Sequence, residues 1–119
     1  MIDPFSSGSW LVLYVKHNCE KKVHQRLMDL GIETYLPTLT VVRQWSDRKK
    51  KLQVPAVSGI VFVRLPISEK NKVFSVAGAV RFLFMDGVVA QVPNHEIESM
   101  KRYLDGKGQV DQTKYQRGA

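Results

Sequence analysis

The chain has 119 residues, enough for one domain with its own core, and it carries a formal net charge of +7 at pH 7. This excess of positive charge favours nucleic acid or another acidic surface as a partner. The single cysteine, Cys19, excludes an intrachain disulfide, and no run reaches the roughly 18 apolar residues that a membrane helix needs. We therefore expect a cytoplasmic protein with no membrane partner.

The first part of the chain predicts a strand, a helix and a second strand. Residues 1–9 have no signal-peptide pattern and are expected to be a flexible lead-in. Residues 10–16 (WLVLYVK) predict a central strand, and residues 32–36 predict a second one that Pro37 stops. Between them we expect a helix that is capped by Asn18, carries Glu20 near its positive end and stops at Gly31. Its inward stripe is predicted to be Cys19, Val23, Leu27 and Leu30.

Residues 43–64 (RQWSDRKKKLQVPAVSGIVFVR) change abruptly from basic to apolar and β-branched. Residues 39–45 predict extended chain, residues 46–48 a turn, and residues 52–54 an antiparallel return. Residues 60–65 predict the third main strand. The stretch therefore predicts a basic hairpin held out from a small sheet.

The remaining elements are predicted from capping residues and glycines. Ser68 is expected to cap a short helix with Val73, Phe74 and Val76 inside, ended by Gly78. Residues 80–85 predict a fourth strand, and Asp86-Gly87 predicts a tight hairpin turn before residues 88–92. Asn94 is expected to cap a last helix, and residues 106–119 are expected to be a linker or tail. The apolar stripe of that helix is predicted to be Ile97, Met100 and Leu104.

This element order predicts an α+β fold, in which helices flank a mostly antiparallel four-stranded sheet. Catalysis is not predicted, because the three histidines are scattered and no glycine-rich phosphate loop is present. Cys19 and His17 could form a thiolate–imidazole pair, but an inert cysteine at the start of a buried stripe is favoured. We expect no enzyme activity, no metal and no cofactor.

Two basic sets are candidate nucleic-acid contacts. In the hairpin, five cations and a tryptophan match phosphate contact supported by base stacking: Arg43, Trp45, Arg48, Lys49, Lys50 and Lys51. The alternative is a solvated edge whose lysines only prevent aggregation. The second set lies where the first strand meets the first helix: Lys16, His17, Lys21, Lys22 and Arg26.

In order, the motifs WLVLYVK, GIETYLP, RQWSDRKKK, P-x-x-x-G-x-VFVR, G-x-VRF and P-x-x-E-I resemble the N-terminal (NGN) domain of NusG-type transcription elongation factors. Within that family they are most similar to the specialised RfaH and UpxY-type antiterminators. The resemblance covers residues 10–105 and implies a ferredoxin-like fold. It also implies a monomer that binds RNA polymerase and suppresses pausing or termination.

The resemblance also implies particular contact residues. An apolar patch would dock on the clamp helices of the largest polymerase subunit, through Tyr14, Val57, Ile60, Phe62 and Met85. The second large subunit would be met by Ser68, Glu69, Lys70, Asn71 and Lys72. The non-template DNA strand or nascent RNA would be met by Lys16, His17, Lys22, Arg26 and Arg81. The alternative is that Ile60 and Phe62, which share one strand face, are simply core.

The sequence departs from the family pattern in two places. Val57-Ser58-Gly59-Ile60 replaces the usual Phe-Pro-Gly-Tyr, which removes two aromatic residues from the expected docking patch. No sequence typical of the C-terminal KOW barrel follows Asp105. Two other functions stay open at this point: a stand-alone RNA or single-stranded DNA binding module, and an enzyme or small-molecule-binding domain.

Overall fold

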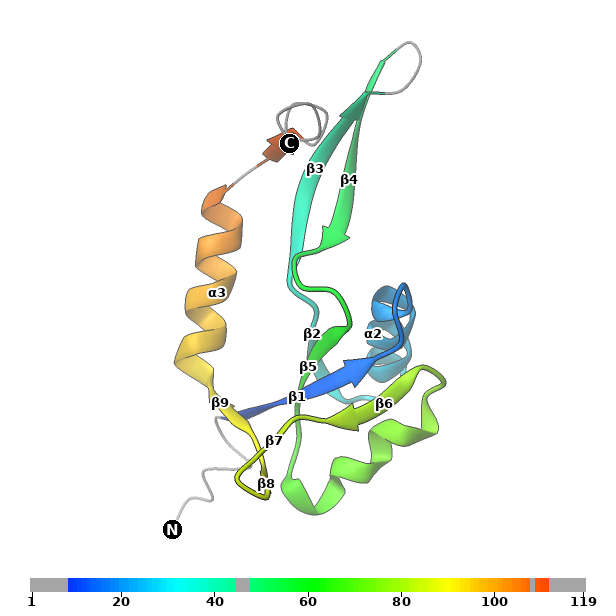
Figure 1. The fold of residues 1–119 in the computed structure, drawn as a ribbon, viewed down its shortest axis with the longest axis vertical. Coiled ribbons are helices and arrows are strands. Elements are labelled where there is room, and N and C mark those ends of the chain that lie inside the picture. Colours follow the sequence, from blue (N-terminus) through cyan, green and yellow to red (C-terminus); the bar gives the residue numbers. More distant parts are fainter. Residues whose placement is uncertain (1–8, 45–47, 108, 112–119) are drawn as a thin grey trace.

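The structure is a computed structural model, and it describes residues 9–44, 48–107 and 109–111 (Figure 1). Its main sheet is built on β1 (Ser9–Val15), whose alternating large apolar side chains are buried on both faces. One edge of β1 pairs with β5 (Ile60–Arg64), which in turn pairs with β2 (Glu33–Tyr35). The other edge pairs with β6 (Ala79–Phe82) and then with β9 (Gln91–Pro93). All these pairings are antiparallel, so the predicted α+β fold is confirmed, and β9 adds a fifth strand.

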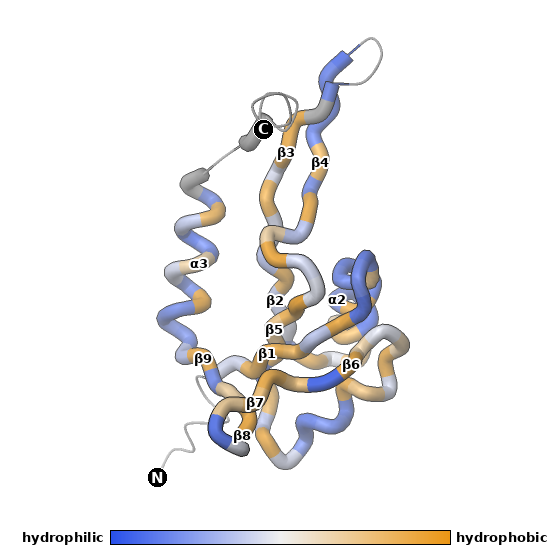
Figure 2. Tube along the Cα trace, in the orientation of Figure 1, coloured by the Kyte–Doolittle hydropathy of each residue, from blue (hydrophilic) through white to orange (hydrophobic). Residues whose placement is uncertain are grey.

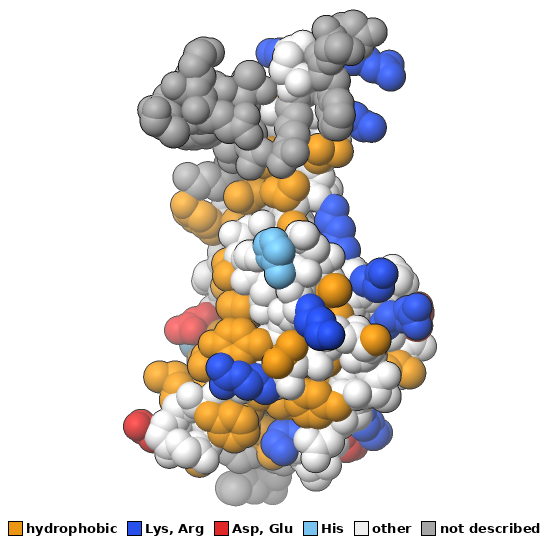
Figure 3. All heavy atoms as spheres, turned by 45° about the vertical axis from the view of Figure 1, so that its right-hand side comes forward, with side chains coloured by type: hydrophobic (Ala, Val, Ile, Leu, Met, Phe, Trp, Pro, Cys, Tyr) orange, Lys and Arg blue, Asp and Glu red, His pale blue; other side chains and the backbone are white. Residues whose placement is uncertain are grey.

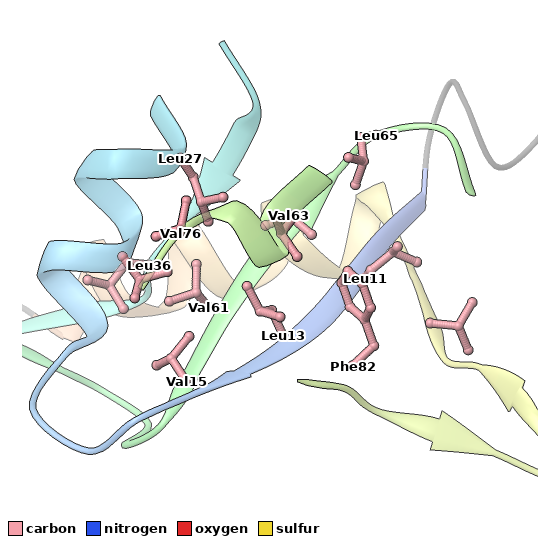
Figure 4. Close-up of a cluster of buried hydrophobic side chains, with 13 residues drawn as sticks. Leu11, Leu13, Val15, Leu27, Leu36, Val61, Val63, Leu65, Val76 and Phe82 are labelled. Atoms are coloured by element: carbon pink, nitrogen blue, oxygen red, sulfur yellow. The ribbon is translucent and has the colours of Figure 1, made fainter. Parts of the chain in front are cut away.

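The two faces of the sheet carry two separate cores, because successive strand residues point to opposite sides. On one face, Leu13, Val61 and Val63 pack against Val23 and Leu27 of helix α2 (Glu20–Asp29) (Figure 4). The 3₁₀ helix η1 (Ile67–Ser75) closes the same core.

On the other face, Trp10, Val12 and Phe62 pack against Ile97 of helix α3 (Asn94–Lys107). Trp10 Nε1 donates a hydrogen bond of 2.9 Å to Asn94 Oδ1 at the helix start. This bond and the apolar packing hold the first turns of α3 on the sheet. None of the helices in the described residues is long and apolar enough to cross a membrane.

The predicted hairpin is formed by β3 (Thr38–Gln44) and β4 (Lys49–Pro55), and it extends away from the main sheet (Figure 1). Along it, apolar and polar residues alternate (Figure 2), with Leu52 and Val54 on one face of β4 and Lys49, Lys51 and Gln53 on the other. β10 (Gln109–Asp111) pairs in parallel with β3. The segment expected to be a linker or tail therefore begins with the end of α3 and contains a strand.

Several predicted helix boundaries are wrong. Cys19, not Asn18, is the N-cap of α2, because Asn18 adopts a left-handed conformation (φ 66°) in the preceding turn, which asparagine tolerates. Leu30 lies beyond the last turn of α2 and is 55% exposed, so it does not belong to the inward stripe. Ser68 lies inside η1, which begins after Pro66, and Phe74 is 41% exposed although its ring packs edge-on against Phe82.

The strand predicted over residues 80–85 is two strands. β6 stays in the main sheet, whereas β7 (Phe84–Met85) leaves it to pair with β8 (Val88–Val89). The predicted turn between them is confirmed: Asp86 (φ 54°) and Gly87 (φ 82°) both have the positive φ that a tight type I′ turn requires.

Candidate functional site

A row of side chains crosses one face of the main sheet beyond the part that α3 covers. Tyr14 of β1 pairs with Ile60 of β5 on one side and with Arg81 of β6 on the other. The Arg81 guanidinium lies 5.0 Å from the centre of the Tyr14 ring, which is a cation–π contact. Tyr14 and Ile60 are half-buried and Arg81 is exposed. Three of the predicted contact residues are thus brought together on one open surface.

A β-bulge in β6 adds another apolar group to this row. Between Tyr14 and Val15 the register with β6 shifts by one residue, so Val80 and Arg81 both lie opposite Tyr14. Val80 is 49% exposed. No sequence pattern predicted this contribution, because a bulge is set by pairing with a distant strand.

The chain continues from β6 into the small β7–β8 hairpin, which is also apolar and open. Met85 and Val88 face each other across it and are 61% and 65% exposed. On the face shown in Figure 3, hydrophobic side chains gather in the lower half, with Lys and Arg side chains among them. We call the following residues the apolar surface: Tyr14, Ile60, Val80, Met85 and Val88.

Phe62, which was expected to belong to the docking patch, lies in the core. Its side chain is 7% exposed, because Ile97 of α3 and the Trp10 ring cover it. The ring also stacks on Tyr35, with 6.2 Å between centroids. Phe62 therefore lies beside Ile60 on the same face of β5, in the part that α3 covers. Val57, on the loop between β4 and β5, is 45% exposed.

The predicted basic set around the start of α2 lies next to the base of the β3–β4 hairpin, and the hairpin set lies further out along β4. Lys16 and His17 occupy the loop after β1, and Lys22 and Arg26 lie one turn apart on the outer side of α2; all four are exposed. Lys21 Nζ donates a hydrogen bond to the backbone oxygen of Gln53 in β4. This bond joins the start of α2 to the base of the β3–β4 hairpin.

Further along β4 the exposed lysines continue toward the hairpin tip. Lys49, Lys50 and Lys51 are all exposed, as is Arg48 just before them. The backbone of Arg43 pairs with Lys50. Trp45 and the side chain of Arg43 lie outside the described residues. We call the following residues the basic surface: Lys16, His17, Lys22, Arg26, Arg48, Lys49, Lys50 and Lys51.

A buried carboxylate lies between the apolar and basic surfaces. Within the described residues, Glu20 is the one charged side chain that is buried, with 4% exposure. Its Oε2 accepts hydrogen bonds from the Gly59 N–H (2.7 Å) and the Ser58 hydroxyl (3.4 Å). Burial alone raises the pKa of Glu20. The bonds from Gly59, its own N–H and Ser58, with the charge of His17, outweigh burial and lower that pKa below its usual value.

Sequence reasoning placed Glu20 in the first turn of α2 but missed this role. The partners lie 38 and 39 positions away along the chain, and no local pattern encodes that pairing. The predicted alternative of a Cys19–His17 pair also differs from the structure. Cys19 packs against the core beside Gly78, and His17 Nδ1 lies 3.1 Å from Ser58 Oγ. The described residues contain no group of three metal-binding side chains.

The residues predicted to meet a second large subunit lie apart from both surfaces, on η1. Ser68, Glu69, Asn71 and Lys72 are exposed, Lys70 is half-buried, and Lys72 forms an ion pair of 2.6 Å with Glu69. Glu69, Asn71 and Lys72 border an open cleft of about 610 Å³ between η1 and the segment that follows α2. An Arg64–Glu33 ion pair of 2.8 Å lies in its wall.

Comparison with known proteins gives a match to a protein family. Residues 8–101 match the family described as transcription termination factor NusG. No curated protein matches the chain at a significant level.

Proposed function

The chain belongs to the NusG family of transcription elongation and antitermination factors, which bind RNA polymerase and are not enzymes. From this premise we propose that the domain docks on the clamp helices of the largest polymerase subunit through its apolar surface. Its basic surface contacts the non-template DNA strand or nascent RNA at the same time. Together these contacts suppress pausing or termination.

The docking proposal depends mainly on one observation: several large apolar side chains are exposed to solvent. Met85 and Val88 are each more than half exposed, and Val80 nearly so. Val80 lies in the row with Tyr14 and Ile60, and Met85 and Val88 lie on the β7–β8 hairpin into which the chain continues from β6. Larger exposed apolar patches that are bordered by polar residues are typical of protein contact sites. Paired helices with an apolar seam are a suitable partner.

Nucleic-acid contact is supported by charge and position. The basic surface runs from α2 along β4, with lysine and arginine ends in solvent. Flexible cations on a protruding two-stranded ribbon suit phosphate contacts that tolerate any base sequence. Arg81 is exposed and its guanidinium lies over the Tyr14 ring of the apolar surface, so it can serve either partner.

We further propose that the protein is a specialised factor of the RfaH or UpxY type that acts on particular operons. The support is the sequence likeness described above. In this role it works as a monomer in the cytoplasm, where transcription takes place, and Ser68–Lys72 on η1 meet the second large subunit.

The test is binding of the domain to purified polymerase core, with Met85→Asp compared with Met28→Asp. Both methionines are about half exposed or more, at 61% and 52%, but Met28 lies on α2 away from the apolar surface. Burying a carboxylate in an apolar contact costs several kcal/mol, so Met85→Asp should weaken binding by about a hundredfold or more. Met28→Asp should leave affinity unchanged.

Equal binding by the two variants would refute docking through the apolar surface. A wild-type domain that ignores polymerase and binds single-stranded oligonucleotides with a steep salt dependence would instead favour the stand-alone binding module. In that case Lys49→Ala, Lys50→Ala and Lys51→Ala combined should remove much of the oligonucleotide affinity.

A further inference from the structure

The loop between β4 and β5 is held in place by hydrogen bonds to residues of β1 and α2. It carries Val57 and leads directly into Ile60. Gly59 adopts a positive φ of 79°, and its carbonyl accepts a hydrogen bond of 3.0 Å from the Val15 N–H. Its own N–H donates to Glu20 at 2.7 Å. Both backbone polar groups of Gly59 are therefore held by residues at the end of β1 and the start of α2.

Ser58 extends this arrangement to the basic surface. Its hydroxyl donates to Glu20 Oε2, so it can accept a hydrogen bond from the N–H of His17 Nδ1 at 3.1 Å. His17 is exposed and lies in the loop whose cations form part of the basic surface. The chain of contacts thus runs from His17 through Ser58 to the buried carboxylate of Glu20.

The carboxylate of Glu20 can position the loop between β4 and β5. A buried charge is costly unless its oxygens are satisfied, and one oxygen of Glu20 receives two donors from the same loop. The bonds hold the loop in one place relative to α2. A shift of His17 toward a bound phosphate would pull on Ser58 and, through it, on the Gly59 peptide that leads into Ile60.

We propose that Glu20 and Ser58 are positioning residues that connect nucleic-acid binding at His17 with the shape of the loop leading into Ile60. The inference rests on the proposed function, because it assigns the two ends of this network to the two proposed partners. Nucleic-acid binding at His17 then changes the position of the loop and raises the affinity for polymerase. Because such coupling is reciprocal, polymerase binding raises the affinity for nucleic acid by the same factor.

The test follows backbone amide signals of the whole chain by NMR while a single-stranded oligothymidine is added. In the wild type, the amides of Gly59 and Ile60 should shift with the same apparent affinity as that of His17. In Ser58→Ala, the shift at His17 should persist and those at Gly59 and Ile60 should be lost. Ser75→Ala is the control, because that hydroxyl also donates one hydrogen bond, to the Lys72 carbonyl, on η1 away from both surfaces.

Polymerase binding provides the second readout. Ser58→Ala should weaken it by about fivefold, the effect of one lost hydrogen bond, whereas Ser75→Ala should not. Glu20→Gln should weaken it as well, even under conditions where the variant is fully folded. If the amide signals of Gly59 and Ile60 shift in Ser58→Ala as they do in the wild type, the inference is wrong, although the proposed function stands. If the wild type binds neither oligonucleotide nor polymerase, the proposed function itself is wrong.

Discussion

Phe62 tests whether α3 covers the second face of the sheet as the structure shows. Truncating a buried phenylalanine to alanine removes its apolar burial and leaves a cavity, which together cost about 3–5 kcal/mol. Phe62 is 7% exposed and also stacks on Tyr35, so Phe62→Ala should lie near the middle of that range, at about 4 kcal/mol. With a urea m-value of about 2 kcal/mol per molar, the unfolding midpoint should fall by about 2 M.

Ile60→Ala is the matched control, since Ile60 lies two residues away on the same face of β5 but is only half-buried. We expect it to cost about 1–2 kcal/mol, because much of its side chain remains in solvent in the folded state. Urea unfolding followed by circular dichroism measures both values and does not depend on Trp10, which lies beside Phe62. Similar small losses for the two variants would mean that Phe62 is a surface residue and that α3 does not pack as described.

Three further predictions concern charge and backbone conformation. Because the folded-state pKa of Glu20 is lowered, its carboxylate should stabilise the fold above the unfolded-state pKa of about 4.3, and this contribution should disappear as pH falls through the folded-state pKa. Urea unfolding of wild type and Glu20→Gln should therefore differ at pH 7, and the difference should shrink as pH falls below about 4.3; a constant difference would contradict the assigned hydrogen bonds. Gly78→Ala should cost more stability than Gly31→Ala, as measured by thermal unfolding. Both glycines have positive φ, but a Cβ at Gly78 would lie 2.9 Å from Val23 Cγ2, whereas one at Gly31 meets nothing within 4 Å. Replacing Lys49–Lys51 with alanine should reduce the slope of log affinity for single strands against log salt by up to about 2, and an unchanged slope would exclude these lysines from phosphate contact.

The sequence predicted the parts of the fold that local patterns determine. Residues 10–15 and 60–63 are uninterrupted apolar runs, and both lie in central strands. The Asp86-Gly87 turn was predictable because few residues other than asparagine, aspartate and glycine accept positive φ at two successive positions. The antiparallel arms of the β3–β4 hairpin followed from a basic turn between alternating segments.

The features that were missed depend on contacts between distant parts of the chain. The burial of Phe62 is decided by where α3 packs. Its strand is apolar on both faces, so the sequence alone could not exclude the docking patch to which Phe62 was assigned. Asn18 has the side chain of a helix cap, yet the turn out of β1 needs a left-handed residue there. The Glu20–Ser58–His17 contacts join two loops that only the pairing of β1 with β5 brings together.

The bulge at Val80 has a consequence for how related chains can diverge. In a regular strand, gaining or losing one residue turns every later side chain to the opposite face and exposes the core. Here, removal of residue 80 would leave Phe82 opposite Leu13 and Ala79 opposite Val15, as they are now. A one-codon insertion or deletion at this position can therefore alter the outer surface of the domain while the interior keeps its pairing.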